Sequence, residues 1–260
     1  MRLVSLNLRF AYNAEMNNQG IREPRVLELV KSYRPAFMGV QECEKFWHER
    51  LVATIGNLGY IPAQPEAVGE DGKYAFKNYI WYDSEAVELI DSGAMWLSET
   101  PDVPSRGFGS RFYISSGYAV MKIKATGECV AYINTHLDVH GEETRKSEIG
   151  VIKAKVKELS DKGYPVFVTG DFNDYEGSAV YLGMTEELHD ARKTAKKSSD
   201  KDTFNGYSAE GVVFPEENWK RIDFCFYNDK VKSIDEFRVV EQCQGGYISD
   251  HNALVIDATL

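Results

Sequence analysis

The chain has 260 residues, of which 43% are hydrophobic and 12% aromatic, so it can bury a large core. Its formal net charge is −10, and proteins that hold long nucleic acids tightly usually present a basic face. The composition therefore disfavours a processive, tightly bound nucleic-acid enzyme. No Pro-, Gly- or Ser-rich linker interrupts the chain, and the longest polar stretch, Lys193–Asp202, is interpreted as a surface loop. We therefore expect a single domain over residues 1–260.

The cysteines and the apolar segments bear on the cellular compartment. The four cysteines are far apart and form no CxxC pair, which predicts reduced thiols rather than a zinc site or a disulfide framework. No apolar run is long enough to span a membrane, and the first residues enter a strand-like segment without the apolar core of a signal peptide. We expect a cytoplasmic protein without membrane contact, and nothing in the sequence implies a protein partner.

Strand-like and helical segments alternate along the chain. The predicted strands, in chain order, are Leu3–Leu8, Ala36–Val40, Tyr79–Tyr82, Ala119–Ile123, Val130–Asn134, Val166–Thr169, Ile222–Tyr227 and Ala253–Ile256. Apolar residues at helical spacing predict one helix that ends before Pro35 and two more over Phe46–Leu58 and Glu143–Leu159. This alternation predicts an α/β or α+β layered domain and leaves the order of the strands open.

Polar and ionisable residues gather at the ends of the strand-like runs, where the active sites of sheet proteins cluster. The groups are Asn7, Gln41-Glu42, Asn134-Thr135-His136-Leu137-Asp138, Gly170-Asp171-Phe172-Asn173, Arg221-Ile222-Asp223-Phe224 and Ser249-Asp250-His251. Each has an ordinary structural interpretation when taken alone. Asn173 could form a turn, Asp171 could cap a helix, and His136 could be a core histidine. Six such groups in one chain favour a shared chemical role.

The residue types in these groups suit metal-assisted hydrolysis of a phosphoester. Mg²⁺ prefers oxygen ligands and takes only one or two protein carboxylates, an inventory that Asn7, Glu42 and Asp250 fit. Hydrolysis also needs a base that deprotonates water and donors around the phosphoryl oxygens. Adjacent residues on an extended chain point to opposite sides, so Asp250 and His251 each need a neighbour of their own.

In this order, from residue 5 to residue 252, the six groups resemble the motifs of the endonuclease/exonuclease/phosphatase superfamily. That superfamily includes pancreatic-type deoxyribonuclease, abasic-site endonucleases, neutral sphingomyelinases, inositol polyphosphate 5-phosphatases and poly(A) deadenylases. Two further segments, Trp96–Pro101 and Gly141–Arg145, resemble bacterial deadenylase-like members of mostly unassigned substrate. Those relatives have an Arg-x-x-x-Trp-Ala-like strand where this chain departs from the pattern over Arg111–Ala119.

The resemblance implies a fold and a metal. The fold would be a four-layered α/β/β/α sandwich of two packed mixed β-sheets with outer helices, and the site would lie at one edge of the sheets. Asn7 and Glu42 would be ligands of Mg²⁺, with Mn²⁺ as an alternative ion, and Asp250 would lie near the metal.

The resemblance also implies catalytic roles. Asp171 would orient or deprotonate the attacking water, and Asn173 would hold a phosphate oxygen. His251, oriented by Asp223, would contact the scissile phosphate or act as acid or base. Its own position at a strand end separately predicts a side chain that solvent reaches. His136 would be the second imidazole on the phosphate. The division of acid and base among these groups stays open.

The substrate also stays open. The sequence favours a Mg²⁺-dependent phosphodiesterase over a phosphomonoesterase, acting on a phosphorylated small molecule or a nucleic acid. One alternative is a nuclease or deadenylase-like 3′-exonuclease, which would want a cationic track. The basic cluster Lys193, Lys196, Lys197 and Lys201 is instead interpreted as a solvated loop. A second alternative, an inactive module that binds a phosphorylated ligand, predicts losses among the site residues, and the sequence has none.

Overall fold

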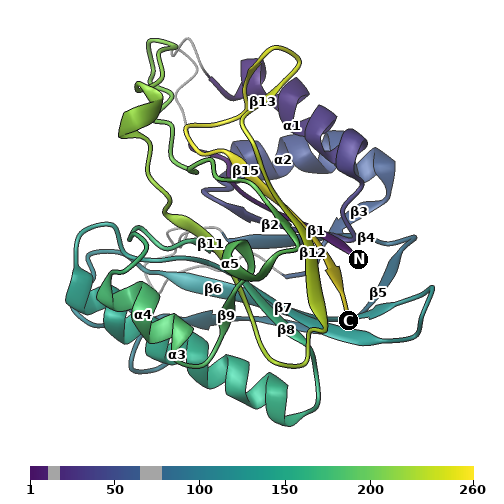
Figure 1. The fold of residues 1–260 in the computed structure, drawn as a ribbon, viewed down its shortest axis with the longest axis vertical. Coiled ribbons are helices and arrows are strands. Elements are labelled where there is room, and N and C mark those ends of the chain that lie inside the picture. The colour runs from purple at the N-terminus through teal and green to yellow at the C-terminus, as the bar shows by residue number, and fades with distance from the viewer. Residues whose placement is uncertain (11–17, 65–77) are drawn as a thin grey trace.

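The computed structural model describes residues 1–10, 18–64 and 78–260. Within these residues, two mixed β-sheets pack face to face, and helices cover the outer side of each sheet (Figure 1). The expected four-layered α/β/β/α sandwich is confirmed. Among the described residues, no helix is both long and apolar enough to cross a lipid bilayer.

The first sheet has seven strands and is built around a parallel pair. Its strands, in spatial order, are β10 (Lys197–Ser198), β12 (Ser233–Val240), β15 (Ala253–Thr259), β1 (Arg2–Asn7), β2 (Phe37–Gln41), β4 (Tyr79–Asp83) and β3 (Tyr60–Pro62). β1 runs parallel to β2 and antiparallel to β15. The carboxyl ends of β1 and β2 therefore meet the beginning of β15 at one edge of this sheet.

The second sheet has six strands and repeats this arrangement. Its strands, in spatial order, are β5 (Val87–Trp96), β6 (Ser115–Ile123), β7 (Cys129–His136), β8 (Val166–Asp171), β11 (Asp223–Tyr227) and β9 (His189–Asp190). β7 runs parallel to β8, and β8 runs antiparallel to β11. The two parallel pairs face each other, since β1 contacts β8 and β2 contacts β7. Four carboxyl ends and two strand beginnings thus converge at one edge of the sandwich.

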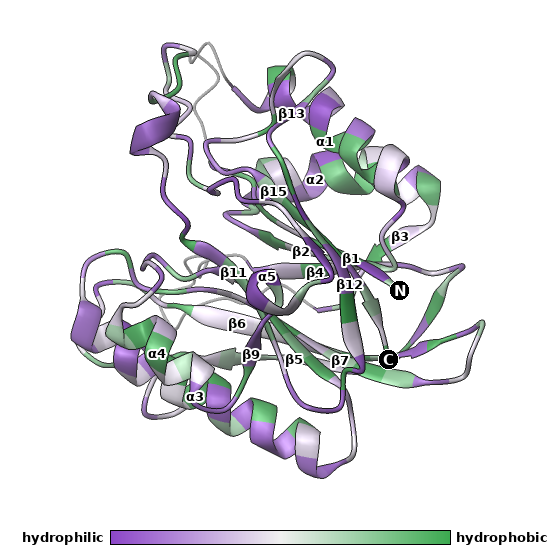
Figure 2. Ribbon diagram, viewed as in Figure 1, coloured by the Kyte–Doolittle hydropathy of each residue, from purple (hydrophilic) through white to green (hydrophobic). Residues whose placement is uncertain are grey.

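The helices bury their apolar faces on the outer sides of the sheets. α1 (Gln19–Tyr33) and α2 (Lys45–Thr54), which continues as a 3₁₀ turn over Ile55–Leu58, cover the first sheet. α3 (Glu142–Asp161) and α4 (Ala179–Thr185) cover the second (Figure 2). The short segments are α5 (Ala191–Thr194), a 3₁₀ turn over Glu216–Asn218, and the hairpin of β13 (Gln242–Cys243) and β14 (Gly246–Tyr247).

A buried polar network fixes the two sheets relative to each other behind the converging strand ends. Tyr132 on β7 accepts a hydrogen bond from Gly39 N on β2 and donates to Val4 O on β1, each at 3.1 Å. Asn134 donates to Val40 O at 2.8 Å. A Cβ at Gly39 would lie 2.6 Å from the Tyr132 hydroxyl, so glycine permits this close approach. Strands from different sheets are thereby held by specific contacts as well as by apolar packing.

All the predicted helices and strands are present, but the structure also contains α4, two long strands and several short elements that were not predicted, and it orders part of the predicted loop. The three helices and eight strands are present, each with its ends shifted by a few residues. β5 and β12 were not predicted, because only three of the ten residues of β5 and two of the eight residues of β12 are buried, so neither forms a continuous apolar run or a regular alternation. The stretch Lys193–Asp202 is exposed over most of its length, but it also contains β10 and the end of α5.

Candidate active site

The edge where the strand ends converge carries all eight side chains that the sequence singled out. Asn7 ends β1, Glu42 follows β2, His136 ends β7 and Asp171 ends β8. The neighbouring antiparallel strands supply three more residues where they begin. Asp223 is the first residue of β11, and Asp250 and His251 come just before β15. Asn173 follows Asp171 by two residues. The sheet topology is thus the reason why residues up to 244 positions apart form one cluster.

Asp171 is the centre of this cluster and is almost fully buried. Its Oδ2 lies 3.0 Å from Asn7 Nδ2, 3.4 Å from His136 Nε2 and 3.6 Å from His251 Nε2. Its Oδ1 accepts a hydrogen bond of 2.8 Å from the backbone N–H of Asn173. The Asp171 carboxylate thereby contacts the imidazoles of His136 and His251. It also contacts the side-chain amide of Asn7, which ends β1 in the first sheet.

Asp223 and His251 form a buried pair next to Asp171. Asp223 Oδ2 lies 2.8 Å from His251 Nδ1, as the sequence led us to expect. The Thr203 hydroxyl accepts hydrogen bonds from the backbone N–H groups of Ile222 and Asp223, and the Phe204 ring lies 5.0 Å from the imidazole. His251 is only 4% exposed, which corrects the expectation of a strand end reached by solvent.

This environment raises the affinity of the pair for a proton. Burial lowers the pKa of His251, but the carboxylates of Asp223 and Asp171 outweigh it and hold that pKa well above its ordinary value. Burial also raises the pKa of the Asp223 carboxyl, although His251 opposes the change. The pair therefore retains one proton as a unit, with Nε2 of the imidazole directed at Asp171.

Glu42 occupies a turn that directs its carboxylate toward the end of β1. Its backbone is left-handed, with φ of 53°, which is uncommon for a residue other than glycine. Its Oε1 accepts a hydrogen bond of 3.1 Å from Asn7 Nδ2, and its Oε2 accepts one of 3.0 Å from Phe10 N. Asn7 Oδ1 in turn accepts from Arg9 N at 2.9 Å. These contacts join the ends of β1 and β2 through side chains.

Asp250 lies on the same side of the site as Glu42. Its Oδ2 forms an ion pair of 3.3 Å with Arg9 Nε, and its Oδ1 accepts a hydrogen bond of 3.0 Å from the Ser249 hydroxyl. Burial raises the pKa of the Asp250 carboxyl, and the neighbouring charge of Glu42 adds to the effect. His251 and Arg9 oppose it. The charges of these two acidic side chains therefore influence each other on this side of the site.

Asn173 has a structural function in addition to its place in the cluster. It adopts a left-handed backbone conformation with φ of 48°, which asparagine tolerates better than most residues. Its side-chain Nδ2 donates a hydrogen bond of 2.8 Å to Leu137 O. Asn173 therefore fixes the segment after β8 against the segment that follows β7, next to His136.

Among the residues that the structure describes at this edge, two groups of side chains could hold a divalent cation. Asp171, Asp223 and His251 offer ligand atoms that all lie within 4.8 Å of one another, but the hydrogen bond between Asp223 and His251 already explains that closeness. Glu42 and Asp250 provide carboxylate oxygens, and Asn7 adds an amide group beside Glu42. An all-oxygen set with clustered negative charge fits a hard cation such as Mg²⁺. The Asn7 amide presents nitrogen to Glu42, and a half-turn about Cβ–Cγ would present oxygen instead.

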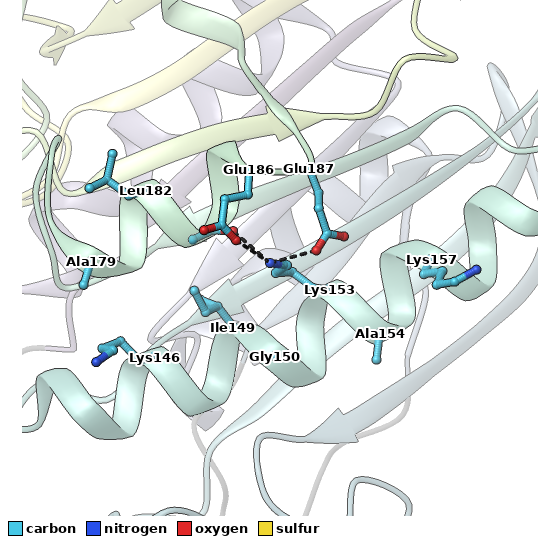
Figure 3. A pocket seen from close by; sticks show the side chains of 11 residues that line it. Lys146, Ile149, Gly150, Lys153, Ala154, Lys157, Ala179, Leu182, Glu186 and Glu187 are labelled. Atoms are coloured by element: carbon cyan, nitrogen blue, oxygen red, sulfur yellow. Dashed lines mark hydrogen bonds and ion pairs between the residues drawn. The ribbon is translucent and has the colours of Figure 1, made fainter.

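A sizeable cavity lies elsewhere, on the outer surface between α3 and α4 (Figure 3). Its volume is about 670 Å³, and its walls include Lys153, which forms ion pairs with Glu186 and Glu187. Small residues line it where the two helices approach each other. None of the eight clustered side chains lines this cavity, so it takes no part in the chemistry of the sheet edge.

Three residues near the site were not singled out from the sequence. The Thr203 hydroxyl accepts a hydrogen bond from the backbone N–H of Asp223, and Arg9 forms an ion pair with Asp250. Arg22 on α1 is fully buried behind the ends of β1 and β2. The sequence held a signal for Arg22, since it precedes Val26 by four residues and so lies on the apolar face of its helix. Thr203 gave no comparable signal.

Comparison with known proteins agrees with this geometry. The model of the Endonuclease/Exonuclease/phosphatase family matches residues 4–251. No curated protein matches the chain at a significant level. A crystal structure of an endonuclease/exonuclease/phosphatase from Bacteroides vulgatus shares 30% sequence identity with a TM-score of 0.89, covering 100% of this chain and 98% of that one.

Two structures from Bacteroides thetaiotaomicron share 25% identity with the chain. One is a mannosyl-6-phosphatase with a TM-score of 0.83, which covers 100% of both chains. The other is an endonuclease/exonuclease/phosphatase family protein with a TM-score of 0.84, which covers 99% of this chain and 97% of that one. The family match and the clustered strand-end residues lead to one conclusion: the chain belongs to the endonuclease/exonuclease/phosphatase family.

Proposed function

We propose that this protein is a Mg²⁺-dependent hydrolase of phosphoester bonds. Members of its family are phosphoester hydrolases that generally use divalent metals. The observation that carries the proposal is the cluster around Asp171, in which a carboxylate lies within 3.6 Å of two imidazoles and beside an acidic, oxygen-rich group. Such a cluster contains both a proton acceptor for water and ligands for a hard cation.

Asn7, Glu42 and Asp250 are the proposed ligands of the metal. A bound Mg²⁺ would supply positive charge at the phosphoryl oxygens. Mn²⁺ should replace it, because it accepts the same oxygen ligands. The clustered charge of Glu42 and Asp250 supports this assignment, since a cation would relieve the repulsion that helps to raise the pKa of the Asp250 carboxyl.

Asp171 is the proposed group that orients or deprotonates the attacking water, and Asn173 is the proposed donor to a phosphate oxygen. His251 is proposed to contact the scissile phosphate or to transfer a proton through Nε2, with Asp223 fixing the ring through Nδ1. His136 is proposed as the second imidazole on the phosphate. The mutual distances support these roles, since both imidazoles direct Nε2 at the same carboxylate.

We propose a phosphodiester as the substrate. A phosphodiester carries one negative charge, whereas a phosphomonoester near neutral pH carries close to two. Four carboxylates, those of Glu42, Asp171, Asp223 and Asp250, lie in the cluster. Arg9 offsets the charge of Asp250 and the protonated His251 offsets that of Asp223, so the net negative charge comes mainly from Glu42 and Asp171. Electrostatic repulsion therefore disfavours the dianion until a metal is bound.

A phosphomonoester is the second candidate, and one relative favours it. The mannosyl-6-phosphatase from Bacteroides thetaiotaomicron aligns over the full length of both chains. A small sugar phosphate as substrate also agrees with the state of the lysines in the predicted basic cluster, because their charges are already paired. Its lysines form ion pairs with acidic neighbours: Lys193 with Glu176, Lys196 with Asp235, Lys197 with Glu236 and Lys201 with Glu216. They do not form a separate cationic track for a nucleic acid.

Paired substrates test the proposal. Hydrolysis of bis(p-nitrophenyl) phosphate, p-nitrophenyl phosphate, mannose 6-phosphate and single-stranded RNA should be measured with Mg²⁺, with Mn²⁺ and with excess chelator. We expect cleavage that depends on the metal. Bis(p-nitrophenyl) phosphate, the diester, should be hydrolysed faster than p-nitrophenyl phosphate, the monoester. A preference for the monoesters would select the second candidate. Tight binding of phosphorylated ligands without cleavage under any condition would instead support the inactive binding module.

A further inference from the structure

Arg22 connects two of the segments that carry the proposed metal ligands. Its guanidinium donates hydrogen bonds to the carbonyl oxygens of Leu8 at 2.5 Å, Arg9 at 2.7 Å and Ile248 at 3.3 Å. Leu8 and Arg9 directly follow Asn7 on the chain, and Ile248 lies two residues before Asp250. One fully buried side chain thus holds the backbone on both sides of the site.

Trp47 on α2 extends these contacts to the third segment. The Arg22 guanidinium lies over its ring, 5.2 Å from the centroid, and the indole Nε1 donates to Arg9 O at 3.2 Å. α2 begins three residues after Glu42, and Leu8 N donates to Gln41 O at 3.0 Å. The carbonyl of Arg9 therefore accepts from two buried donors, at a residue whose backbone is left-handed with φ of 45°.

The charge of Arg22 adds to this geometry. Burial lowers the pKa of the guanidinium to about 10, and the nearby Asp250 and Glu42 carboxylates act in the opposite direction. The group remains protonated near neutral pH, since that value lies well above 7. A buried positive charge thus lies near enough to both acidic groups to offset part of their mutual repulsion before any cation arrives.

We propose that Arg22 is a positioning residue that assembles the segments of Asn7, Glu42 and Asp250 into a metal-binding arrangement in the free protein. The inference rests on the proposed function, because it assigns the metal to these three residues. Residues that support metal ligands from outside the coordination shell typically change metal affinity by about 10–100-fold when they are replaced. Arg22 touches neither the phosphate nor the metal in this account, so its loss should act on metal binding first.

The test compares Arg22→Met, Arg22→Lys and Trp47→Phe with Arg2→Met as the matched control. Arg2, like Arg22, connects β1 with α1, but it lies at the opposite end of β1. There it donates to Tyr33 O and forms an ion pair with Asp257. Mg²⁺ binding is measured without substrate, by calorimetric titration, and kcat and KM are measured at saturating Mg²⁺.

We expect Arg22→Met to weaken Mg²⁺ binding by about 10–100-fold. Arg22→Lys should recover part of the loss, and Trp47→Phe should weaken binding by a smaller factor, because each keeps some of the donors. Turnover at saturating Mg²⁺ should return toward the wild-type value, and Arg2→Met should bind Mg²⁺ normally. Trp47→Phe and Arg22→Lys keep the test decisive if Arg22→Met fails to fold.

Two results would overturn the inference in different ways. Unchanged Mg²⁺ affinity in the folded Arg22 and Trp47 variants, with only a lowered melting temperature, would make Arg22 a purely structural residue while leaving the proposed function intact. Failure of the wild-type protein to bind Mg²⁺ or Mn²⁺ would instead remove the proposed metal dependence together with this role.

Discussion

Asp223 Oδ2 lies 2.8 Å from Nδ1 of His251, although Asp223 begins a strand of one sheet and His251 precedes a strand of the other. The contact therefore depends on how the two sheets pack against each other, and it also belongs to the chemistry of the site. A carboxylate on Nδ1 fixes the ring orientation and leaves Nε2 to face Asp171.

Asp223→Asn should lower kcat by about 10²–10⁴, the usual contribution of a positioned proton-transfer group. The amide keeps the size of the carboxyl but removes the charge that holds the pKa of His251 high. Steady-state kinetics at saturating metal, together with a melting curve, check this outcome. Near-normal turnover would show that Asp223 has only a structural role.

His251→Ala should lower turnover by a similar factor and should also lower the melting temperature. The side chain is buried between Asp223 and Phe204, so its removal leaves a buried carboxylate without its imidazole partner. The double variant with His136→Ala should cost less than the sum of the single losses, since groups that act as a unit are not additive. Additive losses would argue that the two imidazoles act separately.

Removal of the metal should abolish activity, and Glu42→Gln should raise the Mg²⁺ concentration needed for half-maximal activity by at least about tenfold. Glutamine preserves the hydrogen bonds to Asn7 and Phe10 in part, so the turn at Glu42 should survive. Activity measured against Mg²⁺ concentration in wild type and variant checks this. Full activity of the purified protein in excess chelator contradicts it.

Gly170→Ala should destabilise the fold by about 1–3 kcal/mol or more. Gly170 has φ of 148°, and a Cβ there would lie 1.9 Å from Thr135 O, between the parallel strands that carry His136 and Asp171. Gly150→Ala is the matched control, because nothing lies within 4 Å of its Cβ position on α3. That change should stabilise the helix by about 0.5–1 kcal/mol. Urea unfolding distinguishes the opposite signs.

Glu148 should make the stability of the protein depend on pH. The side chain is fully buried, its Oε2 accepts from Asp138 N at 2.9 Å, and its other oxygen has no partner within the described part of the chain. Burial raises the pKa of this carboxyl from 4.5 to about 8, against the opposing effect of that hydrogen bond. The folded state therefore holds the proton more tightly than the unfolded state between these two values.

Stability should fall as pH rises through this window, with a slope of at most about 1.4 kcal/mol per pH unit. Glu148→Gln removes the ionisation while keeping the acceptor for Asp138 N. Urea unfolding of both proteins from pH 5 to 9 should show the wild type losing stability relative to the variant. Parallel curves would mean that Glu148 is ionised in the fold without cost.

The amino-acid sequence alone determined the elements with strong local patterns and the identity of the site residues. α3 could be predicted because its apolar residues recur every three or four positions, and β8 because its run is short, apolar and β-branched. The eight site residues could be named because polar groups at the ends of such runs are chemically conspicuous and occur in the order of a known family.

Tertiary structure decided the contacts among these residues, of which the family resemblance had implied only the pairing of Asp223 with His251. The contact between Asp223 and His251 depends on sheet packing, and the place of Arg22 depends on helix α1 lying behind β1 and β2. β5 could not be predicted because most of its residues are exposed or only partly buried, so it depends on pairing with β6. Local propensity is a property of neighbours along the chain, whereas ion pairs, buried hydrogen bonds and strand order depend on contacts between distant segments.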